Sequence, residues 1–171
     1  MPPAPHPVAE TLSYLAGEWS VRRQVLDRSG GRRGRFDGRA EFRADTGGEW
    51  LHVETGVLEW DGVRREAGRT LRLRPGAAGT AEVAFADGRF FHDLDLRSGR
   101  WRARHQCGAD LYEADFTVVS PAEWHLRWLV RGPAKDQLLD SRYRRLVVPT
   151  VVATALYVSR LSAMRQARRE V

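Results

Sequence analysis

The sequence has little cysteine and almost no lysine, and both shortages narrow the class of protein. Cys107 is the only cysteine among 171 residues, so neither an intramolecular disulfide framework nor a cysteine-rich zinc module is available. Lys135 is the only lysine, and the other 27 of the 28 basic residues are arginine. The apolar run of about 20 residues that a membrane-spanning helix needs is also missing. We therefore expect a cytoplasmic protein of one domain.

The charge is basic but dispersed. The formal net charge is +6 and the isoelectric point is near 10.3, values that would suit a nucleic-acid-binding surface. The arginines are interleaved with aspartate and glutamate along the chain. No nucleic-acid recognition motif is present either, so we expect no nucleic-acid partner.

The N-terminal end is rich in proline. Four of the first seven residues are proline, and this segment lacks the basic and apolar regions of a secretory signal. Residues 1–7 therefore predict a disordered lead-in. Val8, Leu12 and Leu15 then follow at helical spacing and predict one short helix over residues 8–16.

The C-terminal end is apolar and then basic. Residues 147–171 predict a helical tail that begins near Thr150 and follows a barrel domain over residues 8–146. A tail that packs on the barrel or extends into solvent is the favoured interpretation. Contact of the tail with a membrane surface is a less favoured alternative, and a membrane-spanning helix is the least favoured.

Turn residues recur about every ten positions between these ends. Asp61-Gly62 and Asp87-Gly88 are the strongest of nine such turn signals. Nine turns separate ten short segments with alternating polarity, a pattern typical of an antiparallel sandwich or barrel. Because closure removes exposed sheet edges, we predict an all-β, up-and-down barrel of about ten strands.

The turns also predict which residues pair. A two-residue turn at Ser98-Gly99 would pair His92 with His105, and one at Gly108-Ala109 would pair His105 with Tyr112. Four consecutive hairpins then agree on which face is apolar, and a slip of one residue would invert a strand. The aromatic residues predicted to line the interior are Trp19, Phe90, Trp101, Phe116, Trp124 and Trp128.

His92, His105 and Tyr112 would therefore form one polar row on an aromatic wall. Buried polar groups are costly unless they are paired, so the row needs partners. It is a structural cluster that satisfies itself, the polar anchor of a ligand cavity, or a site at which a histidine binds haem or a metal. Two histidines fall short of the three protein ligands usual at catalytic zinc, so no metal site is predicted.

Two further features could contribute to a site. The turn at Asp61-Gly62 places Glu54 opposite Arg69, and we expect this pair to face inward as a buried ion pair. Cys107 falls on the predicted inner face two residues from His105. A buried core thiol is the favoured interpretation, and a Cys–His nucleophile is the alternative.

The start of the first predicted strand, Gly17-Glu18-Trp19, resembles the Gly-x-Trp opening of lipocalins and other calycins. The resemblance implies that Trp19 closes the barrel floor under an arginine near the last strand. Arg144 and Arg145 are the candidates for that arginine.

Residues 10–146 resemble the family called domain of unknown function 6314. The resemblance rests on five stretches of sequence, namely Phe85–His92, His105–Cys107, Asp110–Tyr112, Trp128 and Gly132–Asp136. It implies a calycin-like barrel. It also directs attention to His92, His105, Cys107, Asp110, Tyr112 and Lys135.

The leading hypothesis is a barrel that binds a small, largely apolar molecule, with His92, His105 and Tyr112 as polar anchors. An isomerase, cyclase or hydrolase with a barrel histidine as general base is the alternative. A barrel that binds haem or a metal is the second alternative. The residues single out no cofactor and no oligomeric state. The ligand-binding residues predicted besides the three anchors are Cys107, Trp128, Trp101, Phe90, Phe116, Trp124, Glu54 and Arg69.

Overall fold

The computed structural model describes residues 4–147, which form one short helix and ten antiparallel strands. Short 3-10 turns cover Thr46–Gly48 and Ala77–Gly79. The helix and strands are α1 (Thr11–Leu15), β1 (Gly17–Asp27), β2 (Arg32–Ala44), β3 (Trp50–Trp60), β4 (Val63–Pro75), β5 (Ala81–Phe85), β6 (Phe90–Leu94), β7 (Arg100–Cys107), β8 (Asp110–Ser120), β9 (Glu123–Gly132) and β10 (Lys135–Arg145).

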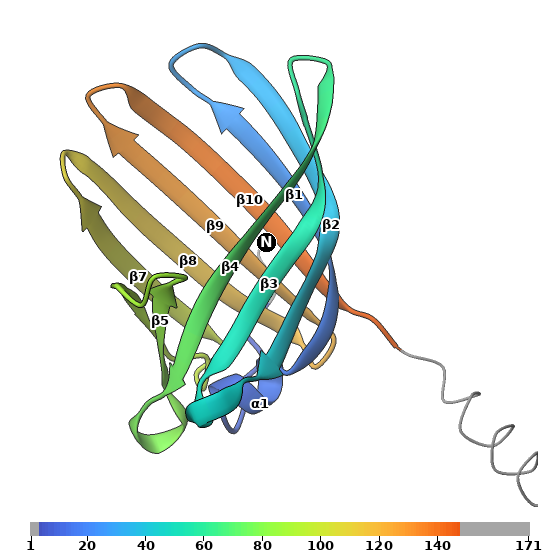
Figure 1. The fold of residues 1–171 in the computed structure, drawn as a ribbon, viewed down its shortest axis with the longest axis vertical. Helices are drawn as coiled ribbons and strands as arrows, with labels where there is room; N and C mark the ends of the chain where they lie inside the picture. Colours follow the sequence, from blue (N-terminus) through green and yellow to red (C-terminus); the bar gives the residue numbers. More distant parts are fainter. Residues whose placement is uncertain (1–3, 148–171) are drawn as a thin grey trace, which may run out of the picture.

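The strands form one sheet in the order β6-β5-β4-β3-β2-β1-β10-β9-β8-β7, which curls into a nearly closed barrel. The first and last strands pair side by side, so the seam of the barrel lies between β6 and β7. Figure 1 shows α1 at one end and the hairpins β1–β2, β3–β4 and β9–β10 at the other end. We call the latter the open end. The predicted all-β, up-and-down barrel is confirmed.

Tight turns set most of the registers as predicted. Asp61 and Gly62 both have positive φ, as a two-residue hairpin turn of this hand requires, and Glu54 consequently pairs with Arg69. His105 pairs with Tyr112 across β7 and β8. These ladders confirm the sequence-based registers of β3–β4 and β7–β8.

The predicted ladder between β6 and β7 is wrong. The backbone between these strands bonds to the N-terminal segment instead, since Leu96 N–H donates to Thr11 Oγ1 (3.1 Å) and Val8 N–H donates to the Arg97 carbonyl (3.2 Å). Trp101 then bridges the seam with an indole N–H that donates to the Asp93 carbonyl at 2.8 Å. His92 is therefore not a ladder partner of His105.

The predicted inward position of Phe90 is also wrong. A bulge between Val83 and Ala84 shifts the register of β5 and β6, so Phe90 pairs with Ala84 and its neighbour Phe91 turns inward. A shift of one residue exchanges the two faces of a strand. Phe90 is consequently 55% exposed, whereas Phe91 is 7% exposed.

The end of the barrel beside α1 is closed by Trp19 and Arg145. Trp19 is fully buried, and its indole N–H donates to the Leu15 carbonyl at 2.7 Å. The Arg145 guanidinium lies 4.1 Å from the Trp19 ring centroid and donates to the carbonyls of Ala16 and Tyr14. The arrangement implied by the lipocalin resemblance is therefore present, and Arg145 supplies the arginine.

The N-terminal helix is shorter than predicted. Glu10 caps it, and the carboxylate accepts bonds from the N–H groups of Leu12 and Ser13, so the helix begins at Thr11. The expectation of a disordered lead-in differs from the structure at His6, whose N–H donates to the Val118 carbonyl at 2.9 Å. The predicted tail helix lies outside the described residues.

We predict that Arg145→Ala lowers the free energy of unfolding by about 2 kcal/mol, because it removes charge-assisted hydrogen bonds to three backbone carbonyls and the cation–π contacts with Trp19 and Tyr14. Urea unfolding followed by tryptophan fluorescence measures the change. The neighbouring Arg144 makes an exposed pair with Glu123 (3.1 Å), so Arg144→Ala should cost less than about 0.5 kcal/mol. Equal losses in the two variants would contradict the role assigned to Arg145.

Candidate functional site

The carboxylate of Glu54 lies inside the barrel and is 1% exposed. Arg69 donates to both carboxylate oxygens through Nε (3.0 Å) and Nη2 (3.1 Å). Arg23 Nη2 also reaches both oxygens, at 3.0 and 2.9 Å, and the Tyr143 hydroxyl donates to Oε1 at 2.5 Å. The predicted inward ion pair of Glu54 and Arg69 is present, and it belongs to a larger set of groups.

Four strands contribute side chains to this set, because each strand places the contributing residue on the inner face of the barrel. Glu54 and Arg69 are ladder partners on β3 and β4, and Arg23 is the ladder partner of Ser141 on β1 and β10. Arg23 Nε donates to Ser141 Oγ at 2.8 Å, and Arg23 Nη2 also donates to the Tyr143 hydroxyl at 2.9 Å. We call Arg23, His52, Glu54, Arg69, Ser141 and Tyr143 the Glu54 cluster.

The cluster fixes the protonation states of its members. Burial would favour a neutral Glu54, but the adjacent Arg69 and Arg23 guanidinium groups hold its pKa well below the usual range. Burial and the charge of Glu54 raise the pKa of Tyr143 to about 12. Burial also lowers the pKa of His52. At neutral pH the cluster therefore holds two cations and one anion.

His52 has an unusual position beside Glu54. Its Nε2 lies 3.3 Å from Glu54 Oε1, but the contact lacks hydrogen-bond geometry. The imidazole instead stacks on Phe42, with ring centroids 4.1 Å apart. We therefore read His52 as a packed neutral ring at the base of the cluster.

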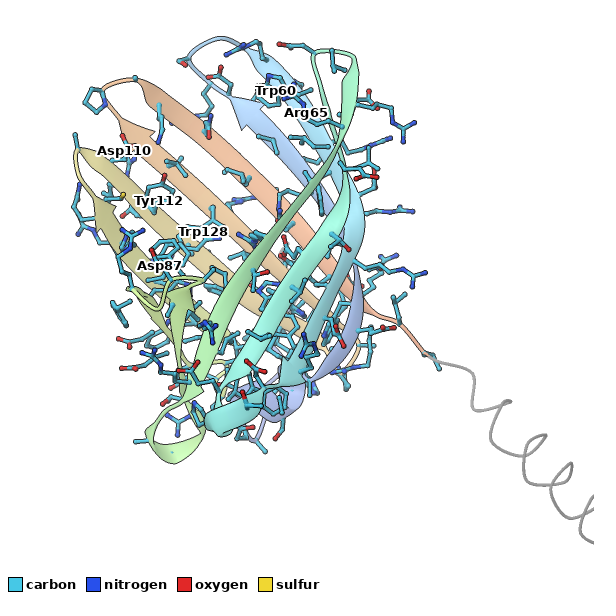
Figure 2. All side chains as sticks on the ribbon, viewed as in Figure 1. Trp60, Arg65, Asp87, Asp110, Tyr112 and Trp128 are labelled. Atoms are coloured by element: carbon cyan, nitrogen blue, oxygen red, sulfur yellow. The ribbon has the colours of Figure 1, made fainter. Side chains whose placement is uncertain are left out.

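A cavity of about 360 Å³ lies above the Glu54 cluster, toward the open end of the barrel. Figure 2 shows Trp60, one of its lining residues, at the end opposite α1. Side chains from β1, β2, β3, β4 and β10 surround the space, and most of them are apolar. The lining residues are Arg23, Val25, Phe36, Glu54, Leu58, Trp60, Ala67, Gly68, Arg69, Gln137 and Leu139.

The predicted polar row behaves as part of an aromatic cluster. Ring centroids of His105 and Tyr112 lie 6.2 Å apart, and those of Tyr112 and Trp128 lie 6.3 Å apart. Phe91 stands between His92 and His105, at 4.8 and 5.0 Å. The three predicted anchors are thus held by ring packing, and His92 is separated from the other two.

His92 is buried beside a much smaller space than the cavity of the Glu54 cluster. This space measures about 30 Å³, the size of one or two water molecules. The neutral imidazole donates from Nδ1 to the Asp93 carbonyl at 2.7 Å, since a carbonyl can only accept. Burial lowers the pKa of His92 to about 4, so the ring is uncharged at neutral pH.

The remaining predicted site residues lie in the core, at the seam or at the exposed end of β7. Phe116, Trp124 and Trp128 are buried in the core, and Trp101 is half-buried at the seam. Cys107 is exposed at the end of β7, so its predicted place in the core is wrong. It lies beside the turn to β8, where the inner face of the sheet meets solvent.

Sequence reasoning did not identify Arg23, Ser141 and Tyr143 as site residues. The signal for Arg23 is its position, since it lies two residues after Val21 and four after Trp19 and so shares the inward face of β1 with these buried residues. An arginine at an inward position needs a buried acceptor. The inward Glu54 supplies that acceptor from β3.

Within residues 4–147, no group of three histidine, cysteine, aspartate or glutamate side chains is arranged to hold a metal ion. In the same range, no helix has the length and apolarity needed to cross a bilayer.

Fold and site together define an up-and-down β-barrel with a buried polar cluster beneath an internal cavity. The chain belongs to the Family of unknown function (DUF6314), whose model matches residues 15–145. The resemblance drawn from the sequence is thereby confirmed. A search of curated proteins found no match.

Solved structures with the same architecture are remote in sequence. The S-type phycobiliprotein lyase CpeS from Guillardia theta matches with a TM-score of 0.60 and 9% identity, over 80% of this chain and 91% of the lyase. A redesigned β-barrel, mFAP0, bound to DFHBI, matches with a TM-score of 0.42 and 15% identity, over 77% and 99% of the two chains. A protein of unknown function from the DUF3598 family of Nostoc punctiforme matches with a TM-score of 0.46 and 9% identity, over 84% and 51%. The likeness to the lyase establishes the barrel fold alone.

We predict that Tyr143→Phe lowers the free energy of unfolding by about 2 kcal/mol, because it leaves a charged, buried Glu54 without one of its donors. Chemical denaturation at pH 7 measures the loss. Tyr112→Phe is the control, since that hydroxyl lies outside the Glu54 cluster. A loss no larger for Tyr143→Phe than for the control would contradict the importance of this bond.

We also predict that stability falls as the pH decreases from 6.5 to about 4. The unfolded chain protonates His92 near pH 6.5, whereas the folded chain holds that pKa at about 4. The neutral ring therefore stabilises the fold above pH 6.5, and this contribution declines by up to about 1.4 kcal/mol per pH unit on acidification. Urea midpoints at pH 7, 6 and 5 should decline less steeply in His92→Gln than in the unmodified protein. Parallel slopes would refute this account.

Proposed function

We propose that the protein binds a small, largely apolar molecule inside the open end of its barrel. The observation that carries the proposal is the cavity of about 360 Å³ next to the Glu54 cluster. Ligand sites in proteins are concave, mostly apolar and about 300–1,000 Å³ in volume, with a few polar groups that orient the ligand. The cavity has this size and this composition.

The architecture supports the same proposal. Barrels of about this size can hold one small ligand in their interior. The end beside α1 is packed with buried rings such as Trp19 and Trp124 and leaves a space of only about 30 Å³, so the larger space lies toward the open end. The phycobiliprotein lyase has a similar fold, which supports the view that a barrel of this architecture can contain a functional site.

The predicted anchors His92, His105 and Tyr112 stay a hypothesis, as does catalysis by a barrel histidine. The space beside His92 is about 30 Å³, which is too small for an organic substrate. The geometry therefore favours the cavity of the Glu54 cluster over the aromatic cluster as the ligand site. Haem binding also stays a prediction and is tested by adding haem to the protein.

We predict that the neutral apolar dye N-phenyl-1-naphthylamine binds with a saturable rise in its fluorescence. Ala67 lines the cavity from β4, so Ala67→Trp should fill the space and weaken binding at least about tenfold, a change of about 1.4 kcal/mol. Fluorescence titration measures the affinity, and thermal unfolding confirms that the variant is folded.

Glu66→Trp provides the matched control, because residue 66 is exposed on the other face of the same strand. It should bind the dye as the unmodified protein does. If His92→Gln or Tyr112→Phe abolishes binding and Ala67→Trp does not, the ligand site lies in the aromatic cluster. If the protein binds neither the dye nor haem, the proposal is refuted.

A further inference from the structure

We infer that the ligand carries an acidic head group, a carboxylate on an apolar body, and that this group pairs with Arg69 and Arg23. The inference rests on the proposed function, because it concerns the molecule in the same cavity. It follows from the unused donors and the excess positive charge of two arginines that line that space.

The first observation concerns unused donors. A guanidinium has five N–H bonds in a planar fork. Arg69 uses Nε and Nη2 on Glu54, and Arg23 uses Nε and Nη2 on Ser141, Glu54 and Tyr143. Among the described residues, the Nη1 group of each arginine makes no hydrogen bond. Each arginine thus keeps at least the two donors of its Nη1 group, and both arginines line the cavity.

The second observation concerns charge. The cluster holds two guanidinium groups and one carboxylate, and burial keeps His52 neutral. Asp27 also lies on the inward phase of β1, nearer the open end, but Arg32 pairs with it at 3.0 Å. One positive charge therefore stays uncompensated at the floor of the cavity.

The third observation concerns the surroundings of that charge. The Arg23 side chain is only 10% exposed, and that of Arg69 is 34% exposed. Leu58, Trp60 and Leu139 form apolar walls around them. A charge in such surroundings is costly unless it is paired, and the pairing gains strength away from water. A monoanion of modest size with an apolar body matches both the excess charge and the walls.

A carboxylate fits the geometry better than a compact cation or a neutral polar group. The two unused Nη1 groups belong to guanidiniums that already converge on one carboxylate, that of Glu54. Arginine forks recognise planar carboxylates through paired N–H donors. The ligand's acidic group would therefore complete an Arg–carboxylate network of which Glu54 is the built-in half.

The test compares decanoate with decan-1-ol, which share an apolar chain and differ in the head group. Both compete with bound N-phenyl-1-naphthylamine in a fluorescence displacement assay at pH 7.5. The unmodified protein should bind decanoate at least about tenfold more tightly than decan-1-ol, as expected for charge-assisted hydrogen bonds. In Arg69→Met this ratio should fall to about one.

Two further variants keep the test decisive. Glu54→Gln removes the competing carboxylate and retains hydrogen-bonding groups, so the preference for decanoate should rise, a gain that unfolding cannot imitate. Arg64→Met is the matched control, since Arg64 is exposed on the other face of β4, and it should keep the original preference.

The outcomes separate this inference from the proposed function. If the dye and both competitors bind but decanoate has no advantage, the acidic head group is refuted and the apolar site stands. The same holds if the advantage persists in Arg69→Met, because the anion would then bind elsewhere. If neither the dye nor the competitors bind, the proposed function itself fails.

Discussion

The buried carboxylate of Glu54 constrains the whole barrel. An ionised group so far from water is stable only if donors surround it, and here Arg23, Arg69 and Tyr143 reach it from three other strands. The same requirement divides the interior into two parts. Toward α1 the core is filled by aromatic rings, whereas beyond the cluster the wall is apolar and the space is free. The donors that the buried Glu54 requires thus form the floor of the candidate site together with it.

Much of the fold could be predicted because local turns set the strand registers. Turns such as Asp61-Gly62 specify both the hairpin and its pairing, and alternation then specifies the buried face. The errors arose where a longer-range contact overrides the local pattern. The bulge at Val83 changes the phase of β5 and β6, and the backbone near Leu96 bonds to the N-terminal segment instead of to β7. Neither feature leaves a signal in the neighbouring residues.

The candidate site shows the same contrast between residues that a local turn pairs and residues that only a long-range contact brings together. Glu54 and Arg69 could be paired from sequence because one tight turn joins their strands. Arg23 and Tyr143 are separated by 120 residues, and no turn determines the register between the first and last strands. The histidines were predicted as site residues because they are polar residues on a predicted apolar face. His92 is hydrogen-bonded to the Asp93 carbonyl, and both histidine rings pack against Phe91. The charged residues of the interior, by contrast, border the cavity.

The position of the seam has a consequence for how the barrel matures. The neighbouring strands β6 and β7 share no ladder, while β1 is flanked by β2 and by β10, the last strand to be made. Closure therefore depends on a contact between the two ends of the domain, the kind of non-local contact that slows folding. On the ribosome, the N-terminal strands emerge with Glu54 and its two arginines before Tyr143 has been synthesised. The hydrogen-bond network around Glu54 therefore lacks its Tyr143 donor until β10 pairs with β1, and the polar centre of the barrel is completed only when the barrel closes.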